Sequence, residues 1–128
     1  MRLLLDTHAL LWWWNDDAQL SDPARRALAD ERNEVLVSAA SAWEIATKQR
    51  IGKLPILPWP AGGFDGMVAA EGFTSLPIQA RHAWQAGALN WSHRDPFDRM
   101  LAAQAILEGL TLVSRDAIFA DRPVSVLW

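Results

Sequence analysis

The sequence predicts an α/β fold built on a mainly parallel sheet of four to five short strands. Short apolar runs such as Leu3-Leu4-Leu5 and Val35-Leu36-Val37 have the length and composition of strands that are buried on both faces. Longer segments with helical spacing and recognisable caps lie between these runs. Strands that alternate with helices favour a parallel sheet joined by right-handed crossovers.

The element boundaries come from capping and helix-ending residues. A cap followed by proline starts one helix at Ser21, and Gly52 and Gly109 each end another. Either Ser38 or Ser41 caps the helix that ends near residue 51. Strands are expected at residues 2–6, 35–37, 73–76, 110–113 and 124–127. Helices are expected at residues 8–14, 21–32, 38–51, 64–72, 79–89, 95–108 and 116–119, with a loop at 54–63.

Composition limits the class of protein. The 128 residues, of which 51% are hydrophobic, are expected to form one domain over residues 1–128. No apolar run approaches the roughly 18 residues of a membrane span, and no signal-peptide pattern is present, so we expect a soluble, cytoplasmic protein without membrane contact. The absence of cysteine excludes disulfides and thiolate metal sites. A formal charge of −3 argues against a general nucleic-acid coat.

Two of the predicted strands end in the same way, in a hydroxyl and a carboxylate. Asp6-Thr7 follows the first strand, and Ser114-Arg115-Asp116 follows the strand at 110–113. Parallel strands end at one edge of their sheet, and ligands of open α/β sheets bind at that edge. Asp6 and Asp116 are therefore expected to converge.

Two helices are expected to bring further acids to that edge. Glu44 lies in the first two turns of the helix after the second strand, and Asp98 lies in the first turn of the helix before the strand at 110–113. Two carboxylates about 5 Å apart repel by roughly 3 kcal/mol at an effective dielectric of about 20. A cluster of four therefore calls for a cation or for raised pKa values, and oxygen ligands suit Mg²⁺ or Mn²⁺. Such ions polarise phosphates and activate water.

Each acid also has a purely structural interpretation. Glu44 can complete a capping box with Ser41, or pair with Lys48 one turn on. Asp95 is an ideal helix cap before a proline, and the other acids stand at strand ends or helix starts, where any carboxylate is favourable. Only the expected meeting of the four acids at one sheet edge points to function.

Basic residues and histidines near the acids are candidates for substrate contact. Arg99 and Arg115 are each placed to pair with an acid or to hold a phosphate oxygen, and His93 and Arg94 are placed either to contact a substrate phosphate or to form a solvated loop. His8 is close enough to line the site, but a buried or turn histidine is expected there. Other chemistries fit poorly, since the chain has no Gly-rich phosphate loop, no G-x-S-x-G turn and no H-E-x-x-H helix. A phosphatase that uses Asp6 as nucleophile would usually show a second Asp where His8 stands.

Four motifs together resemble a known family. They are Leu3-Leu4-Leu5-Asp6-Thr7-His8-Ala9, Ser41-Ala42-Trp43-Glu44-Ile45 with the following Lys48 and Gly52-Lys53-Leu54, His93-Arg94-Asp95-Pro96-Phe97-Asp98-Arg99, and Ser114-Arg115-Asp116. Their order and spacing resemble PIN-domain ribonucleases, and among these the VapC-type toxins of bacterial toxin–antitoxin pairs. The resemblance covers residues 2–128.

The resemblance implies a three-layer α/β/α fold and a Mg²⁺- or Mn²⁺-dependent endoribonuclease. The catalytic and metal-binding positions of the family fall on Asp6, Glu44, Asp98 and Asp116. The residues expected to order the site or contact substrate are Thr7, Arg94, Arg99, Ser114 and Arg115. Homodimers are implied, inhibited by a small antitoxin whose tail lies over the active-site groove.

The Trp12-Trp13-Trp14 segment is a candidate for such a protein contact, although three successive side chains cannot all face inward on one helix. At least one of these rings is expected to pack in the core. Two alternatives to the ribonuclease stay open: a non-catalytic interaction module with the same fold, and a DNA-directed nuclease or phosphatase. The presence of all four acids argues against the first.

Overall fold

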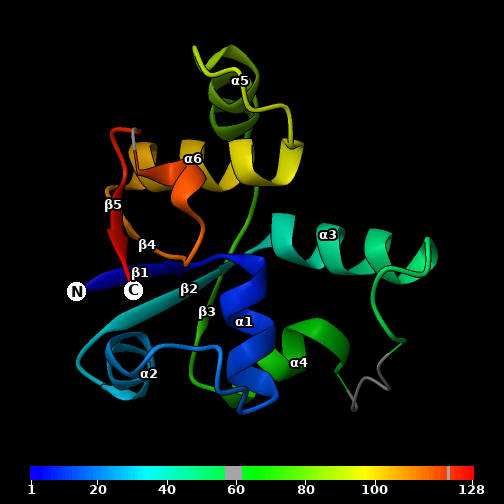
Figure 1. The fold of residues 1–128 in the computed structure, drawn as a ribbon, viewed down its shortest axis with the longest axis vertical. Helices are drawn as coiled ribbons and strands as arrows, with labels where there is room; N and C mark the ends of the chain where they lie inside the picture. Colours follow the sequence, from blue (N-terminus) through cyan, green and yellow to red (C-terminus); the bar gives the residue numbers. More distant parts are fainter. Residues whose placement is uncertain (57–61, 121) are drawn as a thin grey trace.

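A five-stranded, wholly parallel sheet forms the centre of the protein (Figure 1). The computed structural model describes residues 1–56, 62–120 and 122–128. The strands are β1 (Arg2–Leu5), β2 (Glu34–Ser38), β3 (Thr74–Leu76), β4 (Thr111–Val113) and β5 (Ser125–Leu127). Their spatial order is β3-β2-β1-β4-β5, so β1 lies in the middle. The prediction of a mainly parallel sheet with four to five short strands is confirmed.

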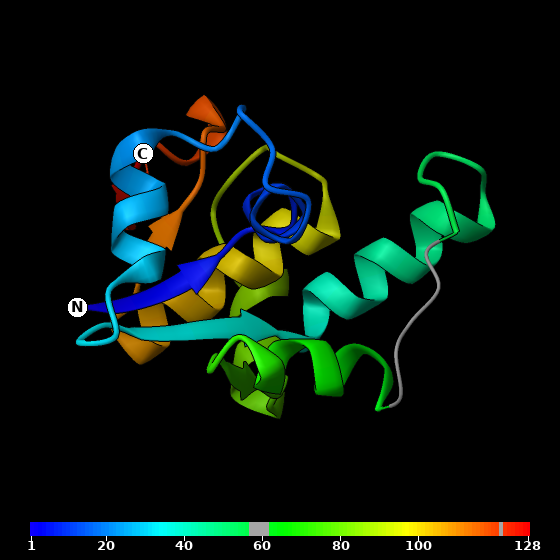
Figure 2. The same cartoon turned by 90° about the horizontal axis from the view of Figure 1, so that it is seen from below.

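Helices cover both faces of the sheet, which gives the predicted three layers (Figures 1 and 2). The helices are α1 (Thr7–Trp14), α2 (Asp22–Ala29), α3 (Ala39–Arg50), α4 (Gly63–Ala70), α5 (Ala80–Ala88) and α6 (Pro96–Glu108), followed by the 3-10 turn η1 (Ala117–Phe119). Helices α1, α2 and α4 cover one face, and α5 and α6 cover the other. Helix α3 extends outward from the end of β2 (Figure 2).

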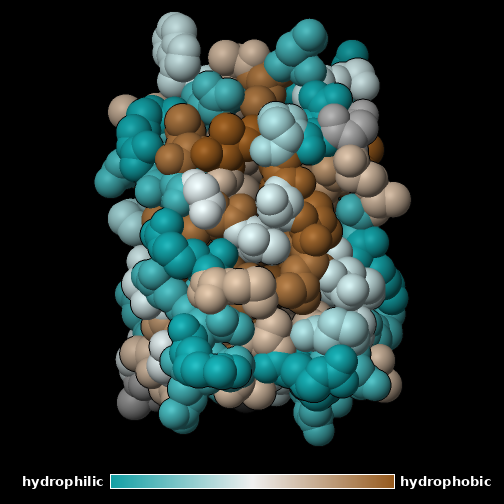
Figure 3. Space-filling view, turned by 90° about the vertical axis from the view of Figure 1, so that its left-hand side faces the viewer, coloured by the Kyte–Doolittle hydropathy of each residue, from teal (hydrophilic) through white to brown (hydrophobic). Residues whose placement is uncertain are grey.

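The alternation of side chains along β1 explains why its sequence is apolar throughout. Leu3 and Leu5 are buried in the cluster under α1 and α2, whereas Leu4 is buried in the cluster under α6. A strand covered on both faces has no solvent-facing position, and its residues form a continuous apolar run. Figure 3 faces the β5 side of the sheet and shows a band of apolar side chains; Val126 of β5 is among the exposed apolar residues.

Two predicted boundaries differ from the structure for local reasons. Helix α2 ends at Ala29 rather than at residue 32, because the Asp30 carboxylate accepts a hydrogen bond from the Arg32 N–H and turns the chain. Helix α3 is capped by Ser38, so the capping box of Ser41 with Glu44 is wrong. Residues 57–61 of the predicted loop at 54–63 lie outside the described residues.

The three consecutive tryptophans each contact a different aromatic ring. Trp12 contacts the C-terminal Trp128 with ring centroids 5.8 Å apart, Trp13 contacts Phe73, and Trp14 contacts Phe64 edge to face. All three pack against the core under α1 and α2. The prediction that at least one packs in the core is confirmed. Among the described residues, no helix is long and apolar enough to cross a membrane.

Candidate active site

The carboxyl ends of β1 and β4 place their following residues side by side. Leu5 pairs with Val113, and the Asp6 N–H donates to the Val113 carbonyl at 3.1 Å. The chain leaves β1 directly into α1 and leaves β4 into the turn before η1. Asp6 and Ser114 therefore lie at one edge of the sheet, as the sequence predicts.

All four predicted acids line one cavity of about 280 Å³ at this edge, which we call the acidic cavity. Glu44 reaches it from α3 and Asp98 from the first turn of α6. Its lining residues are Asp6, Thr7, His8, Glu44, Lys48, His93, Asp95, Asp98 and Asp116. The structure thus brings together acids that are spread over 110 positions of the sequence.

Asp6 is buried, with only 7% of its surface exposed. Its Oδ1 accepts the Ala9 N–H at 2.7 Å, which makes Asp6 the cap of α1. Burial raises the pKa of the Asp6 carboxyl, while hydrogen bonds from Ser114 and the Ala9 N–H act in the opposite direction, and the nearby Glu44 adds to the rise. The fold therefore holds a carboxylate at a position where burial disfavours its charged form.

Glu44 is also buried, with 4% exposure, and is held by its own helix. Its Oε2 accepts from the Lys48 Nζ at 2.5 Å, one turn further along α3. This is the pairing that the sequence spacing offers as a structural interpretation, and it is confirmed. The lysine neutralises one buried carboxylate in a cavity that contains several.

Asp98 is another acid of the cavity whose pKa is raised. Burial raises the pKa of its carboxyl to about 6, opposed by a hydrogen bond with His93 and reinforced by Asp95 and Glu44. His93 Nε2 lies 2.7 Å from Asp98 Oδ2. The sequence predicts for this histidine only a phosphate contact or a place in a solvated loop. The loop conformation that turns its ring toward α6 has no recognisable signature in the sequence.

Asp95 and Asp116 both serve as caps. The Asp95 Oδ1 accepts the N–H groups of Phe97 and Asp98, so its predicted role as a helix cap is confirmed. The Asp116 Oδ1 accepts the Ile118 N–H at 3.0 Å and caps η1. Asp116 is nevertheless exposed and lines the cavity, so its second carboxylate oxygen is accessible there.

Thr7 and Ser114 hold the site together. The buried Thr7 hydroxyl donates to the Ser41 Oγ at 3.0 Å, which ties α1 to α3. Ser114 is buried, accepts the Asp116 N–H and hydrogen-bonds with Asp6. Both side chains are thus placed to order the acids, which is one of the two roles that the sequence assigns to them.

The prediction that Arg99 contacts substrate is not supported. All five N–H donors of a guanidinium are engaged here by backbone carbonyls. The acceptors are the carbonyl oxygens of Ala86, Gly87, Leu89, Trp91 and His93. Arg99 instead fixes the chain between α5 and α6, including the loop that carries His93.

Arg115 and His8 lie at a second, larger cavity of about 590 Å³. This cavity shares Asp6, His8 and Asp116 with the acidic cavity. The Arg115 guanidinium stacks over the Trp12 ring at 4.5 Å from its centroid. His8 is exposed rather than buried, because it faces outward from the first turn of α1, where it stacks on Trp12. Arg94 is exposed on the loop before α6.

The four carboxylates are ligands of the type that a hard divalent cation prefers. In the described part of the chain, however, their side chains do not form a complete set of metal ligands. Four carboxylates, with oxygen as the only ligand atom, match the preference of Mg²⁺ and Mn²⁺. Within residues 1–56, 62–120 and 122–128, however, no three acidic or histidine side chains form a ready metal-ligating group. Each acid is instead bonded to a donor of the protein, namely the Ala9 N–H, Lys48, His93 or the Ile118 N–H.

The sequence matches one family profile over almost its whole length. The profile is described as PIN domain and matches residues 3–124. Ribonuclease VapC22 of Mycobacterium tuberculosis is 33% identical over 133 aligned residues, which cover 97% of each chain. Ribonuclease VapC16 of the same organism is 53% identical over 38 residues, or 30% of this chain and 27% of that relative.

Solved structures with the same fold support the architecture. VapBC2 from Rickettsia felis, bound to a DNA fragment from its promoter, aligns with a TM-score of 0.65 at 16% identity, covering 99% of this chain and 98% of that one. A toxin–antitoxin complex from Klebsiella pneumoniae aligns with a TM-score of 0.60 at 17% identity, covering 98% and 96%. At these identities the likeness concerns the fold.

Proposed function

Since this chain belongs to the PIN domain family, we propose that it is a divalent-metal-dependent endoribonuclease and the toxin of a bacterial toxin–antitoxin pair. The observation that carries the proposal is the convergence of Asp6, Glu44, Asp98 and Asp116 on one cavity at the carboxyl edge of the sheet. The relative that aligns along the whole chain is named a ribonuclease, which supports RNA as the substrate.

The four acids would hold the cation, with Asp6 and Asp98 binding it directly and Glu44 and Asp116 binding it directly or through water. When bound, Mg²⁺ or Mn²⁺ neutralises charge on the scissile phosphate and makes a bound water more acidic. Glu44 and Asp98 would exchange Lys48 and His93 for the cation as their partners. Lys48 and His93 line the same cavity and would be available there to contact the phosphate.

Two arginines are proposed to contact the RNA backbone. Arg115 lies at the second cavity next to Asp116, and Arg94 is exposed on the loop beside His93. Guanidinium groups bind phosphate oxygens through paired N–H donors. Thr7 and Ser114 are proposed to affect the reaction by ordering the acids. Thr7 acts through its hydrogen bond to Ser41, and Ser114 acts through its hydrogen bond to Asp6.

A small antitoxin is the proposed protein partner, with its tail over the groove formed by the two cavities. Two of the similar structures are described as toxin–antitoxin assemblies or VapBC pairs, which supports this choice. We further propose a homodimer in the bacterial cytoplasm, with Mg²⁺ as the physiological metal and Mn²⁺ as a substitute.

The test of this proposal is cleavage of an unstructured RNA with Mg²⁺ or Mn²⁺, with a chelator, and by Asp6→Asn. Asparagine retains the capping oxygen for the Ala9 N–H, so the variant is expected to fold. We expect cleavage that needs the metal and is lost in Asp6→Asn. Cleavage that survives either the chelator or the substitution would contradict the mechanism.

One observation favours a second candidate, a non-catalytic interaction module. Among the described residues no three acids are arranged for immediate metal binding. A module would show neither RNA hydrolysis nor metal-dependent stabilisation. Parallel assays on single-stranded DNA and on a simple phosphate ester separate the ribonuclease from a DNA-directed nuclease and from a phosphatase.

A further inference from the structure

Beside the acidic cavity lies a pair of aromatic side chains that the proposed chemistry does not use. Trp43 and Phe97 meet edge to face, with ring centroids 4.7 Å apart and planes at 75°. Each immediately precedes a carboxylate of the cavity, Glu44 on α3 and Asp98 on α6. The pair therefore bridges the two helices next to the point at which each presents its acid.

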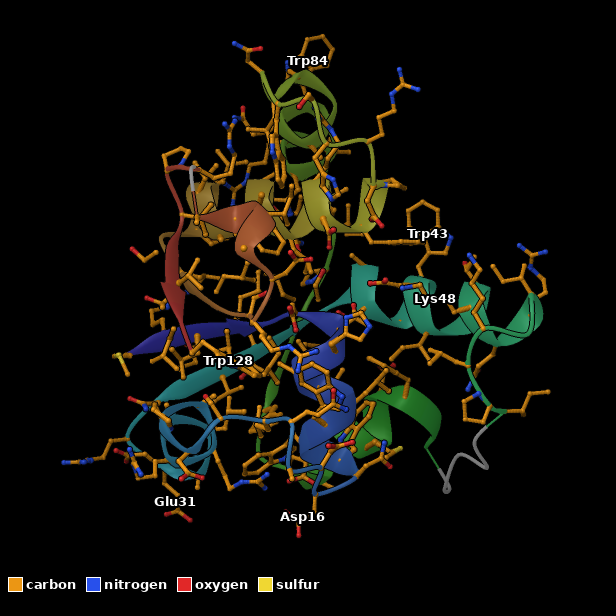
Figure 4. The ribbon with its side chains drawn as sticks, viewed as in Figure 1. Asp16, Glu31, Trp43, Lys48, Trp84 and Trp128 are labelled. Atoms are coloured by element: carbon orange, nitrogen blue, oxygen red, sulfur yellow. The ribbon has the colours of Figure 1, made fainter. Side chains whose placement is uncertain are left out.

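Trp43 presents much of its ring to solvent. Its side chain is 53% exposed, and Figure 4 shows it rising from α3 toward the start of α6, on the side from which Lys48 also projects. An edge-to-face contact uses at most one face of one ring. At least one face of the Trp43 indole therefore lies outside the pair.

We propose that the Trp43–Phe97 pair is a stacking platform for an unpaired RNA base next to the phosphate held at the acidic cavity. The inference rests on the proposed ribonuclease function. Unpaired bases are recognised largely by stacking on aromatic side chains, which tolerates any sequence because every base has a flat face. A base is separated from its phosphate by one sugar, so a platform directly beside the phosphate site is in the right place.

Because the protein has a net negative charge, an uncharged stacking platform would add to its affinity for RNA. Affinity for nucleic acid usually comes mainly from cations that neutralise phosphates. This chain has a formal charge of −3, and the Lys48 ammonium is paired with Glu44. Stacking adds affinity that does not depend on charge, so its contribution should change little with salt concentration.

The surroundings of the pair favour a nucleotide over a docking protein. Surfaces that dock proteins are usually broad apolar patches of a few hundred Å². In the described part of the chain, the residues that directly follow the two rings in sequence are the carboxylates Glu44 and Asp98, and Glu44 pairs with the Lys48 ammonium. A flat ring next to ionic groups matches a base joined to a phosphate.

The test measures binding, with Mg²⁺ present, of a fluorescent single-stranded RNA of about twelve nucleotides whose phosphorothioate linkages resist hydrolysis, and of an abasic oligomer with the same backbone. Trp43→Leu retains apolar packing on Phe97 but has no aromatic face, whereas Trp43→Phe retains one. We expect Trp43→Leu to weaken binding of the base-bearing RNA by roughly 5- to 150-fold, with Trp43→Phe close to wild type. Binding of the abasic oligomer should be the same in all variants.

Trp84→Leu is the matched control, because Trp84 is 80% exposed at the outer end of α5 and points away from the cavity (Figure 4). Equal RNA affinity in wild type and Trp43→Leu would overturn the platform, as would an equal loss for both oligomers. A variant that loses only binding of a protein partner would overturn it too. If wild type cleaves RNA with Mg²⁺ while Trp43→Leu binds normally, only the platform fails; if wild type cleaves no RNA, the proposed function fails.

Discussion

The protein contains two groups of polar side chains that involve both α3 and α6, and they differ in how their charged and polar atoms are satisfied. In the first group, which we call the polar network, Ser38 donates to Gln104, and His82 is bonded to the Gln79 N–H and to Glu108. In the acidic cavity, four carboxylates line one space, where Lys48 pairs with Glu44 and His93 hydrogen-bonds to Asp98.

The difference shows in the pKa values. Hydrogen bonding from His82 lowers the pKa of Glu108, so that carboxyl is stabilised in its charged form. Burial raises the pKa of Asp6 and of Asp98. A closed network of unlike partners strengthens the fold, whereas a cluster of like charges weakens it and persists where a function needs it.

The largest expected effect is on catalysis. Asp98→Asn should lower RNA cleavage by about 10²–10³-fold, because it removes a negative ligand that the reaction needs. Its free energy of unfolding at neutral pH should be unchanged or higher, since burial penalises the charged form. Asp22→Asn, an exposed acid in the first turn of α2, is the control and should cleave normally. Loss of both activity and stability in Asp98→Asn would contradict the proposed difference between the acidic cavity and the polar network.

The opposite pattern is expected in the polar network. Gln104→Leu leaves the Ser38 hydroxyl and the Pro77 carbonyl without their partner in a buried site. We expect a loss of about 2–4 kcal/mol in the free energy of unfolding, measured by urea denaturation. Cleavage per folded molecule should change far less than in Asp98→Asn. An unchanged urea midpoint would show that the network contributes little.

The two arginines near His93 extend the comparison. Arg99→Lys replaces five donors on backbone carbonyls with a single ammonium and should cost about 1–3 kcal/mol of stability. Arg94→Lys changes an exposed side chain and should stay within about 0.5 kcal/mol of wild type. Thermal or urea unfolding of the two variants side by side measures the difference, and equal stabilities would contradict the structural role of Arg99.

The smallest expected effect is a pH dependence. The pKa of Asp98 is about 6 in the folded protein against 3.8 as the ordinary value, so the folded state binds its proton more tightly. In metal-free protein this group therefore adds stability as pH falls from about 7 toward 4, and the added stability is lost as pH rises through about 6. The difference in melting temperature between wild type and Asp98→Asn should follow that pH window. A difference that is constant across it would contradict the raised pKa.

Most of the fold follows from local patterns. The apolar runs of β1 and β2 and the caps at Ser21 and Asp95 act on neighbouring residues, so sequence alone locates them. The four acids could also be placed, because the parallel topology sends strand ends and helix starts to one edge.

What the sequence does not reveal depends on contacts between distant segments. The five carbonyls around Arg99 come from residues 86–93, and nothing in their side chains marks them as acceptors. The turn of His93 toward Asp98 depends on the conformation of the loop before α6, and the pairing of Trp43 with Phe97 arises only when α3 and α6 meet.

The proposed function requires that the acidic cavity binds a divalent cation through carboxylates from four parts of the chain. Calorimetric titration of metal-free protein with Mn²⁺, beside Asp6→Asn and Gln104→Leu, tests it most directly. We expect saturable binding of Mn²⁺ to wild type and to Gln104→Leu, with a raised melting temperature for both. We expect no such binding to Asp6→Asn. Absence of binding to the folded wild type, or binding that Asp6→Asn leaves unchanged, would contradict it.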